Sequence, residues 1–121
     1  MSTPDISLDA IAQAMETIDP VFLHTPQYAD PGLRDALGCE VVLKVETLNP
    51  IRCFKGRGAC VAMAAIEPGV RVVAASAGNF GQAIAWAGRE RGIPVTIFAA
   101  TTANPRKLAR MRALGADVVQ D

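Results

Sequence analysis

Short apolar runs alternate with helix-like segments from residue 33 to the end of the chain, and this alternation constrains the fold more than any other feature. The apolar runs are rich in Val and Ile, lack strict polar–apolar alternation, and cover residues 40–45, 70–75, 94–99 and 117–119. The helix-like segments cover residues 33–37, 59–66, 80–91 and 105–114. A glycine follows each helix closely, and strands of this kind are typical of parallel sheets covered on both faces. The sequence therefore predicts an α/β fold with three layers, αβα, around a short parallel sheet.

The first part of the chain predicts a helix and an extended arm. Ser7 can cap a helix whose apolar residues recur every three or four positions over residues 8–18. Residues 21–28 are expected to be extended and residues 30–32 to form an Asp-Pro-Gly turn. We therefore predict an N-terminal helix and extended arm over residues 1–32 and a small α/β domain over residues 33–121.

The composition narrows the possible partners. The chain has 121 residues, enough for one domain core, with 12 basic and 12 acidic side chains. Because the formal net charge is zero, we expect neither nucleic acid nor an anionic membrane as a partner. The basic residues between 106 and 112 are accordingly interpreted as a solvated helix face.

Several features favour a cytoplasmic protein. Residues 1–9 do not resemble a signal peptide, and no apolar run is long enough to cross a bilayer. The three cysteines lack the spacing of a zinc site and fit a reducing compartment. His24, the only histidine, has no metal-ligating neighbour, so we expect a structural or solvated role and no metal site.

A lysine lies where the first predicted strand gives way to the next helix. It is Lys55, in the segment NPIRCFKGRGA over residues 49–59. Such junctions are where α/β proteins place their chemistry, and Phe54 beside the lysine suggests partial desolvation of an amine that could react with an aldehyde. On these residues alone, a solvated surface lysine remains the alternative.

A second segment, AASAGNFGQ over residues 74–82, leaves a strand and opens a helix. Its small residues let backbone amides converge on an anion at the helix N-terminus, where a carboxylate or phosphate would fit. An ordinary tight turn is the alternative, and both interpretations stay open. A dinucleotide site is not favoured, because Gly56 and Gly58 lack the third glycine of that pattern; a small Rossmann-like binding module remains the runner-up.

Together these segments resemble the motifs of fold-type II pyridoxal-phosphate enzymes, in particular the threonine and serine dehydratases. The cofactor-lysine motif is carried by Lys44-Val45-Glu46, Asn49-Pro50 and CFKGRGA at residues 53–59. The substrate-carboxylate loop is carried by SAGNFGQ at residues 76–82. The resemblance extends from residue 24 onward and implies the fold of the small domain of these enzymes.

The resemblance also implies a cofactor, pyridoxal 5'-phosphate, and a role for each site residue. Lys55 would be the Schiff-base lysine and later move the α-proton. Phe54 would pack beside the cofactor, and Asn79 would hydrogen-bond the 3-oxygen of its ring. The substrate carboxylate would be held by Ser76, Ala77, Gly78, Asn79 and Phe80.

The implied reaction is β-elimination from a small hydroxy amino acid such as L-threonine or L-serine, giving a 2-oxo acid and ammonia. Ala77 stands where the related racemases carry a proton-donating serine, which favours elimination over racemisation. Cys53 replaces the usual serine, and Phe80 replaces the histidine of the commonest dehydratase loop. Arg52 likewise stands where the motif usually has glycine.

Members of the family continue into a second half that supplies a glycine-rich cup for the cofactor phosphate. No such cup follows Gly81 here, so the small domain is expected to be truncated before the large one. The expected partners are an amino-acid substrate and either a second copy of the chain or the missing C-terminal half. The alternatives are a truncated, catalytically incompetent domain or the Rossmann-like module.

Overall fold

The computed structural model describes residues 6–121 and confirms a mixed α/β fold. Residues 1–5, part of the segment compared with signal peptides, lie outside the described residues. The helices are α1 (Leu8–Thr17), α2 (Pro20–Leu23), α3 (Pro31–Leu37), α4 (Lys55–Ala64), α5 (Asn79–Arg91) and α6 (Pro105–Ala113). The strands are β1 (Gln27–Ala29), β2 (Val42–Lys44), β3 (Val72–Ala75), β4 (Val95–Ala99) and β5 (Asp117–Gln120).

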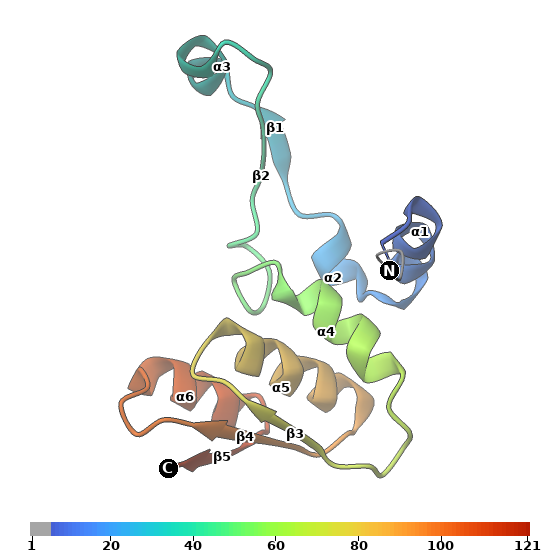
Figure 1. Cartoon of the computed structure of the whole chain (residues 1–121), viewed down its shortest axis with the longest axis vertical. Coiled ribbons are helices and arrows are strands. Elements are labelled where there is room, and N and C mark those ends of the chain that lie inside the picture. Colours follow the sequence, from blue (N-terminus) through green and yellow to red (C-terminus); the bar gives the residue numbers. More distant parts are fainter. Residues whose placement is uncertain (1–5) are drawn as a thin grey trace, which may run out of the picture.

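A short parallel sheet of three strands, in the order β3-β4-β5, forms the base of the molecule (Figure 1). Val72 pairs with Val95, and Thr96 pairs with Asp117. Helix α5 connects β3 to β4, and α6 connects β4 to β5. The predicted parallel sheet is confirmed for these three strands.

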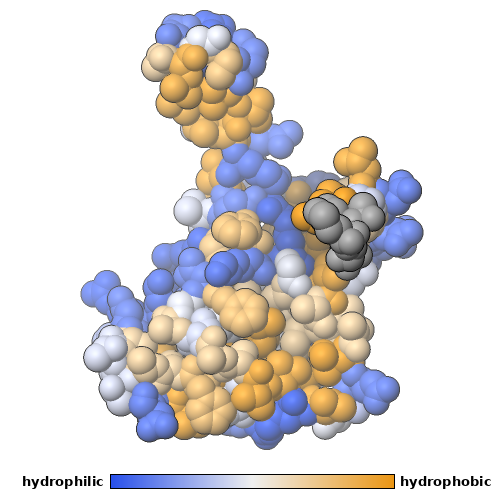
Figure 2. Space-filling model, in the orientation of Figure 1, coloured by the Kyte–Doolittle hydropathy of each residue, from blue (hydrophilic) through white to orange (hydrophobic). Residues whose placement is uncertain are grey.

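The helices lie on one face of this sheet, in an order that differs from the predicted αβα layering (Figure 1). Helix α5 packs on the sheet and α4 packs on α5, so every residue from Gly81 to Gly88 is buried. The opposite sheet face exposes Val73 (60%) and Phe98 (43%), and orange and tan side chains gather over this lower part of the molecule in Figure 2. Within residues 6–121 the layers are therefore sheet, α5 with α6, and α4.

The placement of the strand predicted at residues 40–45 in the parallel sheet is wrong. Its ordered part, β2, pairs antiparallel with β1 in a separate two-stranded ribbon that projects from the molecule with α3 at its tip (Figure 1). The short α3 connection brings the chain straight back, which permits antiparallel pairing, whereas a parallel neighbour requires a longer crossover. The expected boundary between residues 32 and 33 falls inside α3.

Local signals explain the helices of the first part. Ser7 caps α1 as predicted, since its Oγ accepts a hydrogen bond from the Ala10 amide at 3.1 Å. Residues 21–28 are not uniformly extended, because the Asp19 carboxylate accepts from the Val21 amide at 2.9 Å and starts α2. The expected turn at residues 30–32 is instead the start of α3, where Asp30 is the N-cap.

Candidate active site

Lys55 is the first residue of α4, four residues before the predicted start of that helix. The loop before it is organised by Asn49, whose buried side chain is 4% exposed. Asn49 Oδ1 accepts hydrogen bonds from the amides of Ile51 (3.1 Å) and Cys53 (3.3 Å), and its Nδ2 donates to the Cys53 carbonyl at 2.8 Å. These bonds replace the backbone partners that an irregular buried loop lacks, and they fix the turn that leads into Lys55.

Arg57, two residues further on, ties the first turn of α4 to the extended arm. Its Nε donates to the Phe22 carbonyl at 2.9 Å, and its Nη2 donates to Glu46 Oε1 at 2.6 Å and Thr25 Oγ1 at 3.2 Å. Burial alone would raise the pKa of the Glu46 carboxyl, but the hydrogen bonds from Arg57 and Thr25 outweigh it and the pKa lies below its ordinary value. The ion pair therefore holds Glu46 ionised and the start of α4 in place.

The backbone of α4 also approaches the core closely at Gly56. A Cβ atom at this position would lie 2.4 Å from Phe22 Cε1. Phe22 is fully buried and meets the single Trp86 edge to face, with ring centroids 4.8 Å apart. A side chain at this position would overlap the Phe22 ring, so Gly56 allows the Lys55 turn to lie close to the core.

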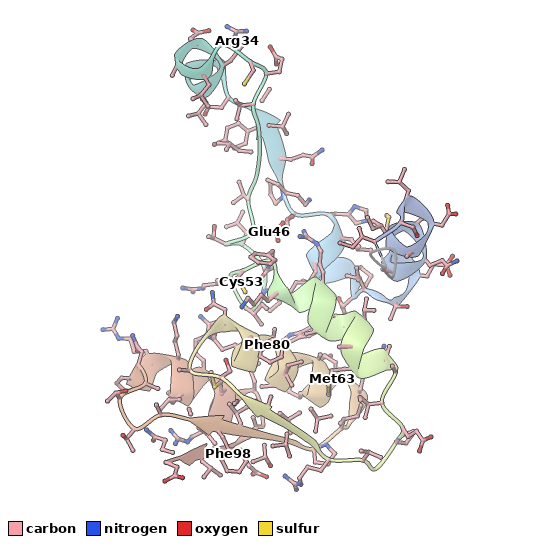
Figure 3. All side chains as sticks on the ribbon, viewed as in Figure 1. Arg34, Glu46, Cys53, Met63, Phe80 and Phe98 are labelled. Carbon is pink, nitrogen blue, oxygen red and sulfur yellow. The ribbon has the colours of Figure 1, made fainter. Side chains whose placement is uncertain are left out.

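The structure brings Lys55 and the second predicted segment together. Lys55 Nζ lies over the ring of Phe80, 6.0 Å from its centroid. Figure 3 shows Glu46 and Cys53 on the segment that leads into α4, and Phe80 at the start of α5 below it. Phe54 and Phe80 also line an open groove of about 360 Å³ with Lys55, Arg57, Gly58 and Ala59.

The amine itself is more open than the sequence suggested. Lys55 is exposed, so the expected partial desolvation is not found among the described residues. Phe54 is 63% exposed and forms an apolar wall of the groove rather than a cover. The groove thus offers a reachable amine between two aromatic side chains.

The loop over residues 76–80 is organised by Ser76. Its Oγ accepts hydrogen bonds from the amides of Gly78 at 3.2 Å and Gly81 at 2.9 Å. The first hydrogen bond of the α5 turn runs from the Gln82 amide to the Gly78 carbonyl, so the amides of Asn79 and Phe80 precede it. Those amides point from the positive end of α5 and can receive an anion, such as a carboxylate.

Close packing behind this loop leaves little room at Gly81, where a Cβ atom would lie 2.7 Å from Met111 Cε and 3.2 Å from Ser76 Cβ. A Cβ atom on Gly78 would lie 3.8 Å from Lys107 Nζ, an ordinary contact distance. Lys107 was predicted to lie on a solvated helix face, but the structure puts its half-buried side chain beside the loop over residues 76–80. Sequence analysis also did not predict the role of Asn49, which bonds to Ile51 and Cys53 within its own loop. Nor did it predict the role of Glu46, whose partners Thr25 and Arg57 lie in other segments.

Other candidate sites contribute little. Cys60 is buried in α4, and burial raises the pKa of its thiol. His24 is exposed at the end of α2. Residues 6–121 contain no group of three or more His, Cys, Asp or Glu side chains placed to hold a metal ion. In that same range, no helix has the length and apolar character needed to span a membrane.

Comparison with known proteins places this geometry in a family. Residues 18–120 match the family described as "Pyridoxal-phosphate dependent enzyme". The chain is 38% identical to the L-threonine ammonia-lyase of Thermotoga maritima, covering 94% of this chain and 29% of that protein. It is 36% identical to the L-threo-3-hydroxyaspartate ammonia-lyase of a Pseudomonas species, covering 90% of this chain and 35% of that protein.

Solved structures give the same result. The serine racemase of Dictyostelium discoideum superposes with a TM-score of 0.85 at 29% identity, over 95% of this chain and 38% of that one. The processed form of threonine deaminase isoform 2 from Solanum lycopersicum gives 0.77 at 30% identity, over 99% and 37%. The chain thus spans about a third of the length of these relatives, from 29% of the Thermotoga protein to 38% of the Dictyostelium protein. The chain belongs to the family of pyridoxal-phosphate dependent enzymes, which its residues 18–120 match.

Proposed function

We propose that this chain supplies the lysine and carboxylate-binding side of the active site of a pyridoxal-phosphate-dependent lyase. The substrate would be a small hydroxy amino acid such as L-threonine or L-serine, which loses its β-hydroxyl by elimination. The observation that carries this proposal is the position of Lys55 Nζ 6.0 Å from the centre of the Phe80 ring, because it joins two segments separated by a helix and a strand.

The residues of the groove fit the cofactor's aldehyde and ring. Lys55 offers an exposed amine, and the aromatic walls Phe54 and Phe80 suit the faces of a flat pyridine ring. We propose Asn79 as the hydrogen-bond partner of the ring's 3-oxygen. When bound, pyridoxal phosphate supplies an electron sink for the substrate's α-carbon.

The chain's own side chains would position the substrate and move its protons. The amides of Asn79 and Phe80 receive the substrate carboxylate, and Ser76, which accepts two backbone hydrogen bonds, still has its hydroxyl proton to donate. Lys55 Nζ takes the α-proton. The β-hydroxyl leaves, and hydrolysis of the eliminated product yields a 2-oxo acid and ammonia.

Ala77 is the reason for proposing elimination rather than racemisation, since relatives of both kinds have this fold. Its methyl group is exposed in the loop and carries no transferable proton. A proton cannot be returned to the opposite face of the α-carbon from this position. Racemisation of L-serine by an active form of the protein would contradict this part of the proposal.

A second candidate is a domain that folds or associates without turnover on its own. It is favoured by an open apolar groove of about 600 Å³ between α1 and α4, whose lining includes Ile11, Met15 and Val61. We propose that the complementary part of the fold, or a second copy of the chain, completes the site.

Covalent labelling tests the assignment of Lys55. Pyridoxal phosphate is added to the chain, borohydride fixes it to the amine that holds it, and peptide mapping locates the label. We expect the label on Lys55 and its loss in Lys55→Ala. The matched control is Lys107→Ala, which removes another lysine beside the carboxylate loop and should keep the label. A label on a different lysine, or an unchanged label in Lys55→Ala, would contradict the assignment.

A further inference from the structure

Lys107, in the first turn of α6, brings an amine to the loop over residues 76–80. Its Nζ lies 3.8 Å from the position that a Cβ atom of Gly78 would take. Gly78 is the N-cap of α5, so the amine lies at the start of the helix whose first amides carry the proposed carboxylate site. Because α5 and α6 each follow a strand of the same parallel sheet and pack against each other, both helices start at one edge of that sheet (Figure 1). No step of the proposed reaction uses this lysine.

The Lys107 amine has no protein partner within residues 6–121, where no hydrogen bond or ion pair involves this side chain. The other lysines differ, because Lys44 Nζ donates to the Thr25 carbonyl at 3.2 Å and Lys55 Nζ lies over the Phe80 ring. Lys107 is half-buried, and a lysine of this kind packs its methylene groups on the protein while its ammonium group stays in solvent. Its three N–H donors are therefore available to a ligand.

Two helix N-termini add positive potential around this amine. Neither α5 nor α6 has an acidic residue in its first turn. The first turn of α6 instead carries Arg106 and Lys107. A helix N-terminus holds about half a positive charge, so a cation there is unfavourable unless an anion lies nearby. The chain thus concentrates positive charge at this edge of the sheet, although its formal net charge is zero.

An anion at this loop can reach both Lys107 and the loop amides. In standard backbone geometry a Cβ atom lies about 3–3.5 Å from the next amide nitrogen, so Lys107 Nζ lies within about 7 Å of the Asn79 nitrogen. A carboxylate that accepts one hydrogen bond on each oxygen can bridge two donors up to about 8 Å apart. Gly78 has no side chain to stand between the amine and the loop. One carboxylate can therefore accept hydrogen bonds from Lys107 and from Asn79 at the same time.

We propose that Lys107 is a further binding group for the substrate carboxylate, together with the amides of Asn79 and Phe80. Its ammonium group supplies a full positive charge, and a hydrogen bond between two charged groups is stronger than one from a neutral amide. This inference rests on the proposed function, because it takes the carboxylate to lie at residues 76–80. Lys107 acts on the binding and orientation of the substrate, whereas the α-proton remains the task of Lys55.

Titration of the isotope-labelled 121-residue chain with acetate tests this role without cofactor or turnover. NMR at constant ionic strength follows the amides of Asn79 and Phe80, whose signals should shift until the site is saturated. Lys107→Gln should weaken acetate binding about fivefold, the upper range for an ion pair that solvent can reach. Lys107→Arg keeps the charge and should restore most of the affinity. Added salt should weaken acetate binding more in the wild type than in Lys107→Gln, because salt screens the ammonium charge.

Arg106→Gln is the matched control, because it removes an exposed cation from the same helix turn and should weaken acetate binding much less. Equal losses in the two glutamine variants would overturn the inference, since overall charge would then explain the effect. Equal acetate affinity in the wild type and Lys107→Gln would also overturn it and leave the proposed function standing. Absence of saturable shifts at Asn79 and Phe80 in the wild type would overturn both this inference and the carboxylate assignment of the loop. The borohydride label on Lys55 tests the cofactor lysine separately, so these failures can be told apart.

Discussion

Replacing Arg57 with leucine should destabilise the protein far more than the same change at Arg71, although each arginine makes an ion pair. The shortest N–O distance is 2.6 Å both in the Arg57–Glu46 pair and in the Arg71–Asp117 pair. Their surroundings differ, because the side chains of the first pair are 26% and 18% exposed and those of the second are 51% and 68% exposed. Solvent screens an exposed pair strongly, so exposure rather than distance should decide the effect.

The expected magnitude follows from the contacts of Arg57. Removing it breaks hydrogen bonds to Phe22, Thr25 and Glu46 and leaves Glu46 without its main partner. Breaking a fully buried ion pair costs about 3–5 kcal/mol. Because about a fifth of each side chain here remains in solvent, we expect about 2–3 kcal/mol for Arg57→Leu. Arg71→Leu should cost less than about 1 kcal/mol.

Urea unfolding followed by Trp86 fluorescence measures both changes, since Trp86 is the single tryptophan and is buried in the core. Equal costs for the two arginine variants would refute the reasoning. A pH series adds a second check, with Glu46→Gln as the reference. The pKa of Glu46 is lowered in the folded state, so its stabilisation is complete above the ordinary carboxyl pKa and is lost as pH falls through the lowered pKa. A stability difference that is independent of pH in the acidic range would argue against the ion pair.

Two further predictions concern the backbone of the same region, and urea unfolding tests both. Gly56→Ala should cost about 1–3 kcal/mol, because its Cβ would lie 2.4 Å from the Phe22 ring; Gly58→Ala, with nothing within 4 Å, should be neutral or stabilising by up to about 1 kcal/mol. Equal effects of these two changes would show that the close contact does not matter. Arg52→Gly should stabilise the fold by about 1 kcal/mol, because glycine relieves the φ of 55°, and a loss of stability would show that the side chain has a structural partner.

The parallel sheet and its helices could be predicted from the sequence because their signals are local. The αL residues Gly38 and Gly92, with φ of 70° and 65°, end helices where the glycine pattern places an end. The ribbon strand β2 could not be placed, since three residues show no useful periodicity and its partner is chosen by the return of the chain through α3. The layering of the helices was not predicted for a related reason. Because β2 lies outside the parallel sheet, α4 has no strand beside it and packs on α5.

The candidate site was predictable only at the level of its segments. Lys55 and the loop over residues 76–80 were found because each lies at a strand-to-helix junction. The supporting contacts join residues that are distant or irregularly spaced, such as Arg57 with Phe22, thirty-five positions apart. No pattern of residue types encodes such a contact, because tertiary packing creates it.

Because residues 81–88 of α5 are all buried, the loop at the start of this helix should open slowly. Amides within Gly81–Gly88 should exchange with solvent only through global unfolding, whereas those of α3, which buries no residue, should exchange through fraying of the ribbon alone. The loop over residues 76–80, which we propose binds the substrate carboxylate, should therefore be attached to the slowest-opening element of the molecule. Lys55 lies on α4, which packs directly on that element.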